Sequence, residues 1–131
     1  MLIVKATGFT EAGVKTSLEY DEALSTYKQS LSRAGMLLAE EKLQPSFSGF
    51  SISYPSHGEA PEIRSGPFSL ERDIIAGFSL IDARSEEEAL EWALRMPVPE
   101  GRGKFELEIR RFEEHPELLH GPGLGFTGIE A

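Results

Sequence analysis

Three polar side chains in the first third of the chain could bind a ligand or move a proton. Lys5 lies in a predicted strand, on the face opposite that of Leu2, Val4 and Ala6. Inside a pocket, such a lysine binds an anionic group or acquires a lowered pKa. The more ordinary interpretation is an ion pair with Glu106 or Glu108 across the sheet. Glu41 and Gln44 follow the second predicted strand, and are either pocket groups or part of a solvated loop.

A second group of candidate residues surrounds a Gly-Pro turn. Ser65 precedes this turn, Phe68 ends it and Arg72 follows shortly after. A serine hydroxyl is a poor nucleophile or base unless a histidine or lysine activates it. The turn supplies neither group, and Lys5 would have to reach Ser65 from across the sheet. We therefore expect Ser65, Phe68 and Arg72 to line a ligand site rather than to form an acid–base pair.

The three histidines do not predict a metal site. His57 lies in a turn, and His115 and His120 lack the spacing of helical metal ligands. The chain has no cysteine, which excludes thiolate ligands and disulfides. The segment GLGFTG (123–128) matches a phosphate-binding glycine pattern by letter, but the three residues after it cannot form the helix that this pattern needs. We expect neither a metal nor a cofactor.

Length and charge limit the possible partners. The 131 residues predict one domain, and 22 acidic against 13 basic residues give a net charge of −9. Nucleic acids and anionic membranes need a basic surface, so neither is an expected partner. No apolar run has the length of a membrane span, and the N-terminus lacks the features of a signal peptide. A cytoplasmic location is the expectation.

Hydrophobic periodicity and turn residues predict two helices and six strands. One helix begins between Ser17 and Asp21 and ends at Ala34, before Gly35; the other begins at Ser85, with Glu88 completing a capping box, and stops before Pro97. The predicted strands are Leu2–Thr7, Met36–Glu40, a half-buried Ser48–Tyr54, Glu62–Arg64, Ile74–Asp82 and Lys104–Phe112. Their order is that of a split βαβ fold with an extra hairpin, within an α+β domain at 1–114. Residues 115–131 form a Gly/Pro-rich tail.

The helices and the turn supply the expected core. Leu24, Tyr27, Leu31 and Ala34 form the apolar stripe of the first helix. Trp92 of the second helix and Phe68, which anchors the Gly-Pro turn, are also expected in the core. Right-handed crossovers place both helices on one face of the sheet. The opposite face then carries Lys5, Glu108 and other residues of mixed character, and a face of this kind needs cover.

Several segments together resemble the YCII-related family, also called the DGPF-domain family. They are Ser65–Phe68, IIAGF (74–78), EEALEWA (87–93), VKATGFTEAG near the N-terminus and LLAEEKLQPS (37–46), so the resemblance covers about residues 1–113. It implies a ferredoxin-like core and a homodimer in which two sheets form a dimeric α+β barrel around a cavity. It does not imply an established activity.

The chain departs from the family signature at two acidic positions. Ser65 replaces the usual aspartate before Gly-Pro-Phe, and Leu70 replaces a glutamate, whereas Arg72 keeps a basic position. A general acid or base must be titratable and within reach of the substrate, so these losses weaken an enzymatic interpretation. The sequence therefore favours a dimeric module that binds a small organic molecule or has a regulatory role. The alternatives are a lyase, isomerase or dehydrohalogenase acting on a small organic acid or aromatic compound, and a partner of a regulatory protein.

Overall fold

The computed structural model describes residues 1–113 of the 131-residue chain. The predicted tail, with His115, His120 and the GLGFTG segment, lies outside the described residues. Within 1–113, no helix is long and apolar enough to cross a membrane.

Four antiparallel strands form the main sheet in the order β2-β5-β1-β6. They are β1 (Leu2–Lys5), β2 (Leu37–Lys42), β5 (Ile75–Ile81) and β6 (Leu107–Ile109). Helix α2 (Leu18–Arg33) connects β1 to β2, and α3 (Glu86–Leu94) connects β5 to β6. Because β5 lies between β1 and β2 and is antiparallel to both, the strand order is that of the predicted split βαβ fold.

Both long helices begin after a serine cap: Ser85 was predicted as a helix start, and Ser17 is the first residue of the range predicted for the other start. The Ser17 hydroxyl accepts a hydrogen bond from the Tyr20 N–H, and the Ser85 hydroxyl accepts one from the Glu88 N–H. The carboxylate of Glu88 accepts from the N–H of Arg84 and not from that of Ser85, so the capping box at α3 is displaced by one residue. Gly35 has a φ of 71° directly after α2, as its position predicted.

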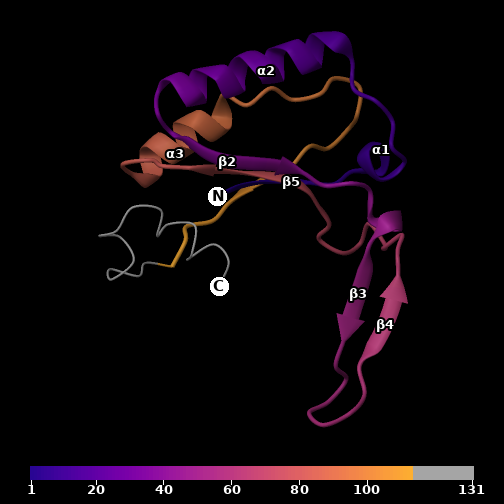
Figure 1. Cartoon of the computed structure of the whole chain (residues 1–131). Coiled ribbons are helices and arrows are strands. Elements are labelled where there is room, and N and C mark those ends of the chain that lie inside the picture. The colour runs from indigo at the N-terminus through magenta and orange to yellow at the C-terminus, as the bar shows by residue number, and fades with distance from the viewer. Residues whose placement is uncertain (114–131) are drawn as a thin grey trace.

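Figure 1 shows both helices on the same face of the sheet, and the core residues lie between the helices and this face. Leu2 and Leu31 are fully buried, and Tyr27, Met36, Ala93 and Met96 complete the cluster. Four expected core positions are not fully buried. Ala34 is exposed because the helix ends there, and Leu24, Trp92 and Phe68 are only partly buried. Trp92 borders the cluster, with its ring beside Tyr27 and beneath the Arg95 guanidinium.

The outer parts of β1 and β6 are shorter than predicted. Strand β1 stops at Lys5, after a register shift between Val4 and Lys5. Thr7, which was predicted to end the first strand, instead caps a short helix, α1 (Gly8–Glu11), and its hydroxyl accepts a hydrogen bond from the Thr10 N–H. The last strand was predicted at Lys104–Phe112, but residues 104–106 and 110–112 lie outside β6.

The extra hairpin is an arm that extends away from the main sheet (Figure 1). It consists of β3 (Phe50–Ser53) and β4 (Glu62–Ser65), which pair only with each other in the described chain. The strand predicted at Ser48–Tyr54 is present as β3, but it is shorter because residues 46–48 form a 3-10 helix. The prediction that it is half-buried was wrong, because Phe50, Ile52 and Tyr54 are 70%, 59% and 68% exposed. Alternation reveals an apolar face, but not whether the same chain covers it.

Ser46 holds the base of this arm, and we call its contacts the Ser46 junction. Ser46 is 7% exposed, and both its N–H and its hydroxyl donate to the Glu11 carboxylate of α1. The Phe68 N–H donates to the Ser46 hydroxyl oxygen over 2.8 Å. Beside it, the backbone of Gly66 passes so close that an added Cβ would lie 1.7 Å from the Ser46 carbonyl oxygen. The junction therefore joins α1 to the segments before β3 and after β4.

This close approach makes Gly66→Ala a sharp test of the junction. The new methyl group would force the two segments apart, and we expect a loss of at least about 1–3 kcal/mol of stability, the usual cost of overpacking. Gly8→Ala is the control, because a Cβ there meets nothing closer than 3.7 Å. Chemical denaturation of both variants measures the difference, and equal stability would contradict the described junction.

Candidate functional site

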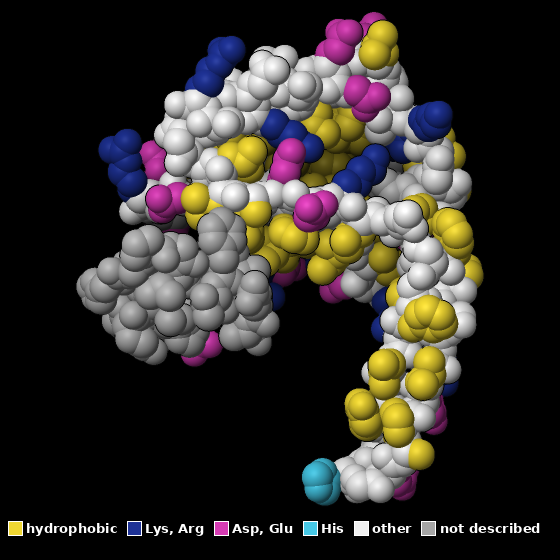
Figure 2. All heavy atoms as spheres, viewed as in Figure 1, with side chains coloured by type: hydrophobic (Ala, Val, Ile, Leu, Met, Phe, Trp, Pro, Cys, Tyr) yellow, Lys and Arg dark blue, Asp and Glu magenta, His cyan; other side chains and the backbone are white. Residues whose placement is uncertain are grey.

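A cavity lies beneath α2 because the central strand carries two small residues there. Strand register pairs Gly77 with Val4 and Ser79 with Leu2, and both partners pack against the core under the helices. Gly77 and Ser79 therefore face α2 as well, but they leave the space between helix and sheet unfilled. The resulting cavity has a volume of about 340 Å³. Figure 2 shows this hollow below α2, with a hydrophobic inner wall and charged side chains of both signs around it.

The cavity wall combines apolar and neutral polar side chains. Its apolar part comes from β1, α2 and the segment between α3 and β6, namely Val4, Leu24, Met96, Pro99 and Phe105. Its neutral polar part includes Tyr20, Thr10 and Thr16. Burial raises the pKa of the Tyr20 hydroxyl, the nearby Asp21 carboxylate raises it further, and Arg102 opposes the shift. The phenol is therefore protonated at neutral pH and can donate a hydrogen bond.

Three acidic residues line the cavity, and two of them, Glu40 and Asp21, already have partners. The Lys28 Nζ of α2 lies 3.0 Å from the Glu40 carboxylate of β2. The Asp21 carboxylate accepts a hydrogen bond from the Thr16 hydroxyl and lies in the first turn of α2, where the helix dipole favours a negative charge.

Two basic side chains at the cavity have no carboxylate partner within residues 1–113. Lys42 lies two residues after Glu40 on β2 and so shares its face of the sheet. Arg102 lies between Gly101 and Gly103, and its Nη2 donates to the carbonyl oxygens of Val14 (3.2 Å) and Lys15 (2.6 Å). Its guanidinium also lies over the Phe9 ring, 5.2 Å from the ring centre. These contacts fix Arg102 between the α1–α2 connection and the α3–β6 connection.

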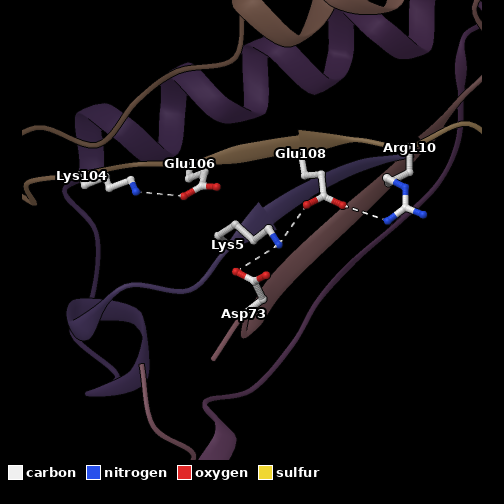
Figure 3. A network of polar contacts seen from close by, with 6 residues as sticks. All are labelled: Lys5, Asp73, Lys104, Glu106, Glu108 and Arg110. Atoms are coloured by element: carbon white, nitrogen blue, oxygen red, sulfur yellow. Dashed lines mark hydrogen bonds and ion pairs between the residues drawn. The ribbon is translucent and has the colours of Figure 1, made fainter. Parts of the chain in front are cut away.

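Lys5 belongs to the other face of the sheet. Its Nζ lies 3.2 Å from the Glu108 carboxylate and 3.7 Å from that of Asp73, and Glu108 also pairs with Arg110 (Figure 3). The hydrogen bond to Glu108 raises the pKa of Lys5. The same bond, with help from Arg110, lowers the pKa of Glu108. The structure thus has the ion pair between Lys5 and Glu108, and a lysine with a raised pKa is not an activated base.

The other sequence candidates lie in different places. Glu41 borders the cavity beneath α2 from strand β2, but its register partner is Phe78 and not one of the helix-facing residues Gly77 and Ser79. Gln44, Phe68 and Arg72 line a separate cavity of about 430 Å³ at the base of the arm, next to the Ser46 junction. The Arg72 guanidinium lies over the Phe68 ring there. Ser65 is exposed on β4, and its hydroxyl makes no hydrogen bond within the described residues. These six candidates therefore do not form one site.

Sequence reasoning missed the residues that shape the cavity, although two signals were available. Gly77 interrupts a strand that is otherwise rich in bulky residues, and a glycine inside a strand often marks a close backbone approach. Here a Cβ on Gly77 would lie 2.9 Å from the Glu41 carbonyl oxygen. The second signal is Arg102, which lies between two glycines, a pattern typical of a loop with a specific backbone conformation. As for metals, the part of the chain that the structure describes holds no group of three potential ligands.

The ion pair between Lys5 and Glu108 predicts a specific pH dependence. Because the pKa of Glu108 is lower in the folded protein than its ordinary value of 4.5, its stabilising contribution is present above pH 4.5 and is lost as the pH falls through the folded pKa. Lys5→Met should raise the pKa of Glu108, as measured by NMR titration. Lys104→Met is the control: Lys104 pairs with Glu106, so its removal should leave the pKa of Glu108 unchanged. A Glu108 pKa that does not respond to Lys5→Met would refute the pairing.

Comparison with known proteins assigns the family. No curated protein matches the chain. The family model of the YCII-related domain matches residues 1–113, the same part of the chain that the structure describes. This match covers the split βαβ sheet, the arm and the Ser46 junction. The chain therefore belongs to the YCII-related domain family.

Proposed function

We propose that this YCII-related domain is a small-molecule-binding module whose ligand occupies the cavity beneath α2. The observation that carries the proposal is the space left above Gly77 and Ser79. Its volume of about 340 Å³ falls within the range of small-molecule sites, roughly 300–1,000 Å³. Its mainly apolar wall with a few polar groups is also typical of such sites.

The charged groups support binding more than catalysis. A lyase or isomerase needs a titratable group that can approach the substrate and exchange a proton with it. Lys28 and Glu40 neutralise each other in the cavity wall, and Lys5 is engaged by Glu108 and Asp73 on the other face. Lys5 and Glu41, two titratable candidates from the sequence, form no ion pair with each other within residues 1–113.

A second copy of the chain is the partner that we propose for the exposed apolar surfaces. Phe50, Ile52, Tyr54 and Ile63 form an apolar row on the arm, 59–70% exposed, and Figure 2 shows hydrophobic side chains along it. A two-stranded hairpin is marginally stable in water by itself. The face of the sheet opposite the helices carries further partly exposed apolar residues, including Phe78 and Ile75. Ile75 is the register partner of Lys5 and is 40% exposed. A homodimer would cover both surfaces and make the domain a dimeric module.

Filling the cavity tests the binding proposal. Ser79→Leu places a larger apolar side chain in the space beneath α2, so we expect loss of ligand binding with retained folding. Ser32→Leu makes the same change at an exposed position of α2 and should bind like the wild type. Ligand-observed NMR with a library of small organic fragments provides the measurement, and circular dichroism checks folding. Equal fragment binding by both variants, or the absence of fragment binding to any of the three proteins, would reject the cavity as a site. Conversion of a bound compound to a product would instead support the enzymatic alternative.

Equilibrium sedimentation tests the dimer. The wild type should be a dimer at micromolar concentration, with a total buried area of at least about 1,000 Å². Replacing Phe50 and Ile52 together by serine should produce monomers, because it removes the centre of the apolar row. The control replaces Ser51 and Ser53, on the opposite face of the arm, by alanine, and should leave the dimer intact. A monomeric wild type would be incompatible with the proposal.

A further inference from the structure

We propose that the cavity beneath α2 takes a small organic anion, with an apolar body and a carboxylate or similar group, and that Arg102 and Lys42 bind its charged end. This inference rests on the proposed function and names the chemical class of the ligand.

The local charge balance favours an anion although the whole chain is acidic. The net charge is −9, yet two of the three acidic residues that line this cavity are already engaged: Glu40 by Lys28, and Asp21 by Thr16 and the start of α2. The third, Glu41, has Phe78 as its register partner, so the strand places its side chain on the other face of the sheet. Lys42 and Arg102 have no carboxylate partner in the described chain. Two such cations beside a partly enclosed space are a source of attraction for a negatively charged ligand.

The geometry of Arg102 suits a carboxylate in particular. Both of its hydrogen bonds come from Nη2, so Nη1 and Nε have no acceptor within residues 1–113. A guanidinium presents its donors in a planar fork that matches the two oxygens of a carboxylate. The Val14 and Lys15 carbonyls and the Phe9 ring already hold the side chain in place. Binding would therefore require little further ordering of this arginine.

The other residues of the cavity wall determine which kind of ligand body can accompany the anionic group. Leu24, Met96 and Phe105 offer apolar surface for the body of the ligand. The protonated hydroxyl of Tyr20 can donate to an anionic oxygen, as can the threonine hydroxyls. An inorganic ion would leave the apolar surface unused, whereas an organic cation would meet Lys42 and Arg102. An amphipathic anion satisfies both parts of the wall.

Matched compounds separate this inference from the proposed function. The probes are 2-naphthoate, its neutral amide 2-naphthamide and the cation 2-naphthylmethylamine, measured by NMR shifts of the Gly77 and Ser79 amides in the full chain. We expect 2-naphthoate to bind more tightly than the amide, with an affinity that falls as the salt concentration rises. Equal or tighter binding of the amide or the amine overturns the anion assignment but leaves the cavity as a binding site. Failure of all three to shift these amides overturns both.

Charge-removing variants identify the binding groups. Lys42→Gln and Arg102→Gln should each weaken 2-naphthoate binding by roughly 10- to 100-fold, as expected for a lost hydrogen bond to a charged group, and should leave 2-naphthamide binding nearly unchanged. Lys104→Gln removes the same charge from the same connection, from a residue that does not line this cavity, and should have little effect. Lys42 makes no ion pair in the described chain, so its variant stays informative if Arg102→Gln loosens the connecting segments. Equal effects of Lys42→Gln and Lys104→Gln would refute the assignment.

Discussion

The arrangement of this domain depends on one buried polar contact, the pair of hydrogen bonds from Ser46 to the Glu11 carboxylate. A carboxylate that loses water needs donors, and hydrogen bonds to charged groups contribute about 1.5–3 kcal/mol each. The Ser46 hydroxyl in turn accepts from the Phe68 N–H, so three distant segments meet at one side chain. The contact gives the Gly-Pro-Phe motif an architectural explanation. Gly66 is required because the Ser46 carbonyl occupies the place of a side chain, and Phe68 packs beside Gly49 at the base of the arm.

The two faces of the sheet have different properties because β5 alternates small and large side chains. Gly77 and Ser79 face α2 and leave a cavity there, whereas Ile81, also on that face, closes the core. Phe78 lies on the other face beside Ile3. Lys5 lies on that second face with Glu108, where mutual hydrogen bonding keeps both groups charged. The face with the conspicuous mid-strand lysine is therefore not the face with the cavity.

Local signals in the sequence predicted much of the fold. Ser17, Ser85 and Gly35 determine helix ends through their own hydrogen bonds or backbone conformation, so the helices could be located closely. Thr7 was assigned to a strand because alternation cannot show that its hydroxyl caps a helix instead. Phe50, Ile52 and Tyr54 were expected to be half-buried because their spacing shows an apolar face but not what covers it. The cavity was missed since it depends on long-range pairing: Ser79 becomes a wall residue only when Leu2 and α2 lie beside it.

The arm also has consequences for the solution behaviour of the protein. A sheet of two strands has two open edges, and such edges are templates for pairing with another chain. The arm combines these edges with the apolar row of Phe50, Ile52 and Ile63. A net charge of −9 repels neighbouring molecules at low ionic strength, but salt screens this repulsion within roughly 10 Å at 0.1 M. A protein whose arm is not covered by a partner will therefore aggregate more readily as salt is added. A partner that covers the arm will protect the protein from edge-to-edge association.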